Sequence, residues 1–242
     1  MLTASPIPGL LITGTDTGIG KTLIAGAIAA HLRHQGQRVG VLKPAASGCV
    51  RRREGLVSED AEFLAHCADT PHPLDVIAPI RFAEPLAPAV AAERMKTAFD
   101  WESVQRSIDR IASGADVLIV EGVGGIMVPM DAKHTMLDLA AWLKLPAVIV
   151  ARPNLGTINH TLLTARALKS AGVAVAGVVI NRYPAENPGT AEETNPRAIE
   201  RWGKVPVLCI VPEVKDPIGL TLPADVAAAV ATVDWMSLTR RS

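Results

Sequence analysis

Short, nearly continuous apolar segments alternate along the chain with longer segments rich in alanine and leucine. Strands covered by helices on both faces have this apolar character, as in a parallel sheet. The pattern therefore predicts a parallel sheet between two helical layers. The expected strands are GLLIT (9–13), RVGVLK (38–43), DVLIVE (116–121), PAVIVA (146–151), VAGVVIN (175–181) and PVLCIV (206–211).

The segments between these strands carry end signals of helices. Asp100 is suited to cap a helix N-terminus, and Gly36 and Gly172 are suited to follow a last helical turn. Helices are expected over residues 21–34, 59–67, 100–112 and 159–171. Regular alternation of strands and helices predicts an α/β fold with a doubly wound, mostly parallel sheet.

A single domain is expected over residues 1–242, with flexible ends at 1–9 and 237–242. The proline-rich region 44–99 interrupts the alternation and includes the basic run Arg51–Arg53. We interpret this run as part of a solvated loop, with contact to a phosphate or a partner as the alternative. YPAENPGTAEETNP (183–196) is rich in turn-forming and acidic residues and is expected to form a surface loop.

Composition narrows the classes of function. Lys and Arg together number 24, as do Asp and Glu, so the balanced charge argues against a broad nucleic-acid surface. Three widely spaced cysteines suit a reducing compartment. No apolar run is long enough to cross a bilayer, and the first residues do not resemble a signal peptide. These features predict a soluble cytoplasmic protein.

The segment LLITGTDTGIGKT (10–22) combines a strand, a glycine-rich turn and a helix start. Its Gly20-Lys21-Thr22 ending is typical of a phosphate-binding loop, in which backbone N–H groups surround the phosphates. The lysine of such a loop reaches the β- and γ-phosphates, and the threonine holds Mg²⁺. The loop is one residue longer than the general pattern, but its flanking strand and helix predict a nucleotide site in a P-loop NTPase-like fold.

Acidic residues that could assist Mg²⁺ occur at two places. Glu121 ends the strand DVLIVE, at the sheet edge where parallel sheets bind ligands, and glycines 122 and 124 allow close approach of the backbone. Asp60 lies at an expected helix start, which by itself is an ordinary place for an acidic residue. Lys43 ends another strand, in KPAASG (43–48), and two interpretations are open for it: a contact with an anionic reacting group, or a solvent-exposed strand end.

Several motifs together resemble the dethiobiotin synthetase family. TGTDTGIGKT, KPAASG, EDA, FAEPLAPAVAA, VEGVGG and LGTINHTLLTARAL occur in the family's order, and the resemblance covers residues 10–182. The lengthened phosphate loop is itself a mark of this family. The resemblance implies that ATP and CO₂ convert 7,8-diaminononanoate into dethiobiotin, a cyclic urea, through a carbamate and a carbamic-phosphoric anhydride.

The resemblance also implies roles for single residues. Lys21, Lys43 and Thr17 match catalytic positions, and Thr17 and Ser47 match substrate contacts. The expected Mg²⁺ ligands are Thr22, Asp60 and Glu121. The expected contacts to ATP and its metal ion are Gly18, Ile19, Gly20, Lys21, Thr22, Leu23, Asp60, Glu121, Gly122, Val123, Gly124, Asn181, Arg182, Pro212, Glu213 and Val214.

Among these residues, Asn181 matches the asparagine with which the family recognises adenine. Arg182 stands where the family usually has Asp. NLGTINH (154–160) resembles the segment that binds the substrate carboxylate from a neighbouring subunit, with Asn159 as the side chain involved. The resemblance therefore implies a homodimer.

Two alternatives use the same kind of loop. A ParA/MinD-like regulatory ATPase typically has an extra lysine early in the loop, which GTDTG (14–18) lacks. A cobyrinate-type amidoligase is usually longer and carries a glutaminase part, for which this chain has no room.

Overall fold

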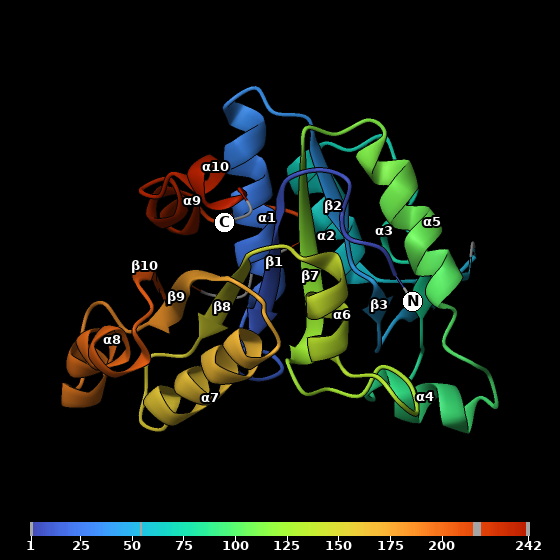
Figure 1. The fold of residues 1–242 in the computed structure, drawn as a ribbon. Helices are drawn as coiled ribbons and strands as arrows, with labels where there is room; N and C mark the ends of the chain where they lie inside the picture. Colours follow the sequence, from blue (N-terminus) through green and yellow to red (C-terminus); the bar gives the residue numbers. More distant parts are fainter. Residues whose placement is uncertain (1, 54, 215–218, 241–242) are drawn as a thin grey trace.

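The structure is a computed structural model that describes residues 2–53, 55–214 and 219–240. Its centre is a six-stranded parallel sheet in the order β10-β9-β8-β1-β7-β2 (Figure 1). All six strands expected from the sequence are present: β1 (Gly9–Gly14), β2 (Val39–Leu42), β7 (Val117–Gly125), β8 (Ala147–Ala151), β9 (Val175–Tyr183) and β10 (Val207–Pro212).

Two small sheets lie in the proline-rich region. β3 (Ala45–Ala46) pairs with β6 (Ile80–Arg81), and β4 (Val50–Arg52) pairs with β5 (Gly55–Val57). Arg51–Arg53 thus belong to an exposed hairpin, whose Arg52 forms an ion pair of 2.6 Å with Glu62.

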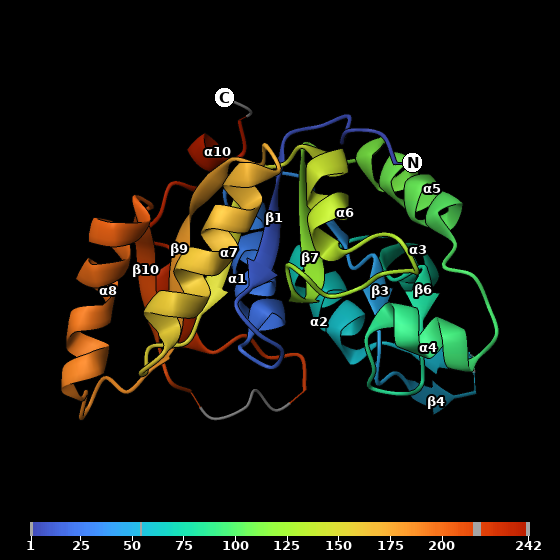
Figure 2. The same ribbon diagram turned by 60° about the horizontal axis from the view of Figure 1, so that its bottom comes forward.

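Helices cover both faces of the central sheet (Figures 1 and 2). Alternate residues of β1 show why its apolar run is continuous, because Leu10 and Ile12 join the core on one face and Leu11 joins the core on the other. α1 (Lys21–His34), α2 (Glu59–Ala68), α9 (Ala224–Val230) and α10 (Trp235–Leu238) contribute to the first core. α5 (Trp101–Ala112), α6 (Met136–Leu143), α7 (Thr157–Ser170) and α8 (Thr190–Gly203) contribute to the second. Two short helices, α3 (Leu74–Ile77) and α4 (Pro88–Arg94), complete the structure.

The residues expected to begin or end helices do so in the structure. The Asp100 carboxylate accepts a hydrogen bond of 2.9 Å from the Ser103 backbone N–H at the start of α5. Gly36 takes a φ of 85°, and its N–H bonds the Arg33 carbonyl at the end of α1. Gly172 takes a φ of 73° after α7. None of the helices within the described ranges is long and apolar enough to cross a membrane.

The expectation of a surface loop over 183–196 is wrong for its second half. β9 extends to Tyr183 and α8 begins at Thr190, so the connection is short. The helix contains Pro196, but Asn195 and Ile199 are buried on its inner face. The Asn195 amide also donates to the Pro153 carbonyl at 2.7 Å. Tertiary packing therefore stabilises a helix in a sequence whose composition is typical of turns.

The chain ends that the sequence predicts to be flexible pack against the domain. Leu2 is buried, and the Ser5 backbone N–H donates to the Leu143 carbonyl at 3.1 Å. Within the other end, Thr239 is 1% exposed and its hydroxyl donates to the Met236 carbonyl at 2.9 Å. Residues 1 and 241–242 of these ends lie outside the described residues.

Candidate active site

The phosphate-loop candidate connects the end of β1 to the start of α1. Gly18 and Gly20 have φ values of 72° and 89°, a left-handed conformation in which other residues are strained. Gly20 is the residue before the first turn of α1, so the helix begins at the loop as the motif requires. The Lys21 side chain folds back over the loop, and its Nζ donates to the Asp16 carbonyl at 3.0 Å. Burial lowers the pKa of Lys21.

The register of the sheet brings Lys43 and Glu121 together. Leu42 of β2 pairs with Val120 of β7, so the two residues that follow are neighbours. The Lys43 Nζ lies 2.7 Å from the Glu121 Oε1. Lys43 is 5% exposed and Glu121 is 1% exposed, so this ion pair is buried. Of the two interpretations of Lys43, the structure excludes a solvent-exposed strand end.

Asp60 reaches the same point from α2. The Ser58 hydroxyl caps this helix by accepting from the Ala61 N–H, and Asp60 lies in its first turn and forms an ion pair with Lys43. A Cβ atom added to Gly26 of α1 would lie 2.4 Å from a ring carbon of Phe63. Glycine at that position therefore allows α2 to approach α1 closely enough to place Asp60 beside the loop.

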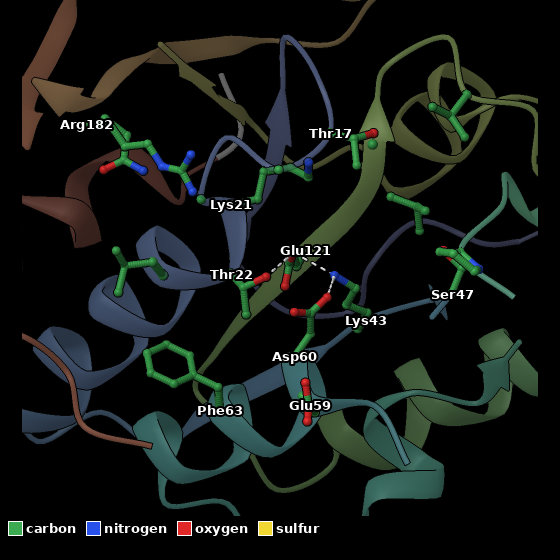
Figure 3. Close-up of a pocket in the computed structure, with 18 of the residues that line it drawn as sticks. Thr17, Lys21, Thr22, Lys43, Ser47, Glu59, Asp60, Phe63, Glu121 and Arg182 are labelled. Atoms are coloured by element: carbon green, nitrogen blue, oxygen red, sulfur yellow. Dashed lines mark hydrogen bonds and ion pairs between the residues drawn. The ribbon is translucent and has the colours of Figure 1, made fainter. Parts of the chain in front are cut away.

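Lys43 forms ion pairs with both Glu121 and Asp60 (Figure 3). Burial alone would lower the pKa of Lys43, but the carboxylates of Glu121 and Asp60 outweigh it and raise that pKa. Burial would also raise the pKa of Asp60, but the Lys43 ammonium outweighs it and holds that pKa below its usual range. Lys43 is therefore a cation shared between two carboxylates.

The oxygen atoms at this point fit a magnesium ion. The Thr22 hydroxyl donates to the Glu121 Oε1 at 2.8 Å, and Lys43 bridges Glu121 and Asp60. The second oxygen of Glu121 is buried and has no hydrogen-bond partner among the described residues. The described residues contain no closed cluster of three or more His, Cys, Asp or Glu side chains. Two carboxylates and one hydroxyl suit Mg²⁺, which takes few protein ligands and keeps water or phosphate oxygens for the rest.

These residues line a cavity of about 560 Å³ at the carboxyl ends of the strands. Figure 3 shows Arg182 at one end and Ser47 at the other, with Thr22, Lys43, Asp60 and Glu121 between them. The predicted site residues on its wall are Thr17, Gly18, Gly20, Lys21, Thr22, Leu23, Lys43, Ser47, Asp60, Glu121, Val123, Gly124, Asn181, Arg182, Pro212 and Val214. The cavity therefore unites segments from most of the chain.

Four predicted site residues are not on the wall of this cavity. Ile19 is buried beneath the loop, and Gly122 is buried beside Met136. Glu213 is exposed, and its backbone N–H donates to the Tyr183 carbonyl at 2.8 Å. Asn159 is exposed in the first turn of α7.

Some wall residues were not assigned to the site from the sequence. Residues 85–87, between two prolines, form part of the wall beside Ser47, and a proline-bounded loop is the signal that could have indicated them. Phe63 lies one helical turn after Asp60, so the i, i+3 spacing predicts that both share a face. Glu59, Val128 and Gly219 also line the cavity and carry no sequence signal of their own.

Comparisons with known proteins agree on the family and the fold. A family model described as an AAA domain matches residues 8–218. The ATP-dependent dethiobiotin synthetase BioD of Bacillus licheniformis is 44% identical over 211 residues, covering 86% of this chain and 87% of the relative. The enzyme of the same name from Thermodesulfovibrio yellowstonii is 40% identical over 225 residues, covering 88% and 93%.

Solved structures with a similar fold include two ATPases. The cell division ATPase MinD of Pyrococcus furiosus aligns with a TM-score of 0.54 at 20% identity, covering 93% of this chain and 96% of that one. A ParA family ATPase from Chlorobium tepidum aligns with a TM-score of 0.57 at 17% identity, covering 94% and 98%. At these identities the likeness shows the shared P-loop α/β fold alone.

Proposed function

The chain belongs to the dethiobiotin synthetase family and is an ATP-dependent ligase of biotin biosynthesis, and from this premise we propose how its pocket performs the reaction. The substrates are 7,8-diaminononanoate, CO₂ and ATP. The observation that supports this proposal is a single cavity with three regions. Arg182 lies at one end, where the nucleotide base is expected (the base end), the charged centre lies at Lys43, and Ser47 lies at the other end.

The reaction has three steps. One amine of the substrate attacks the carbon of CO₂ and loses a proton, which gives a carbamate. A carbamate oxygen then attacks the γ-phosphorus, the bond to ADP breaks, and a carbamic-phosphoric anhydride forms. Finally the second amine attacks the carbamate carbon, the carbon–oxygen bond breaks, phosphate leaves with that oxygen, and the nitrogen loses a proton as the cyclic urea closes.

Cations and positioning supply most of the catalysis, because a carbamate and a triphosphate repel each other. Lys21 stabilises the phosphoryl group in transfer, since it begins α1 where the loop N–H groups converge. Lys43, at the charged centre, stabilises the carbamate and its phosphorylated form. Ser47 and Thr17 hold the diamine.

ATP is expected to lie with its phosphates on the loop and its base between Arg182, Pro212 and Val214. Thr22, Asp60 and Glu121 hold Mg²⁺, and the ion neutralises charge on the β- and γ-phosphates when it is bound. The buried oxygen of Glu121 that lacks a partner supports this assignment.

A homodimer completes the substrate site in this proposal. Asn159 is exposed on α7 and does not line the cavity, so its contact with a substrate carboxylate requires a second copy of the chain. Leu155 and Leu163 lie on the same segment and are 87% and 59% exposed. Apolar side chains so exposed are consistent with a partner that covers α7.

Three free, buried cysteines are consistent with activity in the reducing cytoplasm.

The proposed overall reaction is tested by incubating the protein with 7,8-diaminononanoate, bicarbonate and Mg-ATP. Mass spectrometry should detect dethiobiotin, in equal amount to ADP, and omission of the diamine or bicarbonate should stop ADP formation. ATP hydrolysis that continues without the diamine and gives no cyclic urea would contradict the proposal.

A further inference from the structure

Asn181 makes a contact that reading a base does not require. It lies near the end of β9 and is 2% exposed. Its Nδ2 donates a hydrogen bond of 2.8 Å to the Ile19 carbonyl in the phosphate loop. β9 and β1 are separated in the sheet by β8, so this bond ties the loop to a strand that β1 does not pair with.

The bond fixes the orientation of one peptide group in the loop. In a trans peptide the carbonyl and the following N–H point to opposite sides. Holding the Ile19 carbonyl toward Asn181 therefore turns the Gly20 N–H away from Asn181. N–H groups of such loops are the ones that surround phosphates.

Gly20 and Asn181 are also matched in shape. A Cβ atom at Gly20 would lie 2.1 Å from the Asn181 Nδ2, well inside contact distance. Gly20 therefore needs to be glycine for two reasons, its φ of 89° and the closeness of Asn181. The glycine lets the amide lie flat against the loop, and the amide keeps the loop in the left-handed conformation that the glycine permits.

We propose that Asn181 is a positioning residue for the phosphate loop, and that it strengthens binding of the triphosphate whatever base is attached. This inference rests on the proposed nucleotide site. This role is separate from recognition of adenine, because one N–H of the Asn181 amide already donates to the Ile19 carbonyl in the loop. Within the described part of the chain, that bond is the one side-chain hydrogen bond of Asn181, so its carbonyl oxygen and second N–H could still contact a base.

The test compares ligands that differ in the base. The dissociation constants of Mg-ATP, Mg-ITP and Mg-tripolyphosphate are measured by isothermal titration calorimetry for the wild type and Asn181→Ala. Inosine replaces the adenine amino group with an oxygen, and tripolyphosphate has no base. Loss of one hydrogen bond that orients the loop should weaken binding of all three ligands by about tenfold or more, including tripolyphosphate, which has no base.

Asn187→Ala is the matched control, because Asn187 is an exposed asparagine that does not line the cavity. It should leave tripolyphosphate affinity within about twofold of the wild type. Circular dichroism before each titration checks that Asn181→Ala is fully folded, because a reversibly unfolded fraction would weaken the apparent affinity for all three ligands equally.

A penalty confined to Mg-ATP, with Mg-ITP and tripolyphosphate unchanged in Asn181→Ala, would overturn the inference and leave the proposed function standing. A wild type that binds none of the three ligands would overturn both.

Discussion

The buried Lys43–Glu121 pair gives a quantitative prediction about stability. Glu121 is 1% exposed, and its Oε1 lies 2.7 Å from the Lys43 Nζ. Lys43→Met keeps most of the side-chain volume but removes the cation. Breaking a buried ion pair by removing one partner costs about 3–5 kcal/mol, because the remaining charge stays buried without compensation. For a chain of this size the melting temperature should fall by about 6–20 °C.

Lys21→Met is the matched control. Lys21 is 6% exposed and buried in the same pocket, but its Nζ hydrogen-bonds a backbone carbonyl, and no carboxylate lies within ion-pair distance of it among the described residues. Its replacement leaves no carboxylate unpaired, so the loss should stay near or below about 1 kcal/mol. Thermal and urea unfolding of the protein without added nucleotide measure both variants.

Two further measurements identify the unpaired carboxylate as the cause. Burial outweighs the Lys43 cation and raises the pKa of Glu121. A carboxyl group whose pKa is higher in the folded than in the unfolded protein lowers the free energy of unfolding at pH values above its unfolded pKa. This loss disappears at lower pH, where the group is protonated in both states. The deficit of Lys43→Met should therefore shrink between pH 8 and pH 5. Lys43→Met combined with Glu121→Gln should recover most of the loss in a double-mutant cycle. Equal stability of Lys43→Met and Lys21→Met at pH 8 would refute this reasoning.

Three other substitutions test separate parts of the site. Asn159→Ala should raise KM for 7,8-diaminononanoate with KM for ATP unchanged, and an unchanged KM for the diamine would remove Asn159 from the substrate site. Gly124→Ala should lower kcat and destabilise by about 1–2 kcal/mol, because Gly124 has a φ of 57° and a new Cβ would lie 2.7 Å from Val128. Gly114→Ala, with open space around it, is the control, and equal melting temperatures of the two would contradict that argument. Asp60→Asn should raise the Mg²⁺ concentration for half-maximal activity about tenfold, and an unchanged Mg²⁺ requirement would exclude Asp60 as a ligand.

The six strands of the central sheet and the loop were predictable because local patterns determine them. Each of these strands contains a nearly continuous apolar run, and the strand, glycine turn and helix start around Lys21 are contiguous in the sequence. α8 was not predictable from composition, because a helix containing Pro196 depends on the burial of Ile199 and on a hydrogen bond from Asn195 to a distant carbonyl.

The chemistry of the site depended on contacts between distant residues. The sequence left two interpretations of Lys43 open, and only pairing of β2 with β7 brings it beside a carboxylate 78 residues away. The anchoring contact of Asn181 joins atoms 162 residues apart, so no local pattern could indicate it. Motif resemblance located these residues in the sequence, and tertiary geometry indicates what they touch.

The central claim is that the γ-phosphoryl group passes to a carbamate oxygen within this pocket. Rapid-quench turnover with ¹⁸O-labelled CO₂, unlabelled ATP and the diamine tests it directly. We predict that each phosphate released carries one oxygen atom from CO₂, because the carbon–oxygen bond breaks when the ring closes. Phosphate that carries only oxygen from ATP and water, while dethiobiotin still forms, would contradict it.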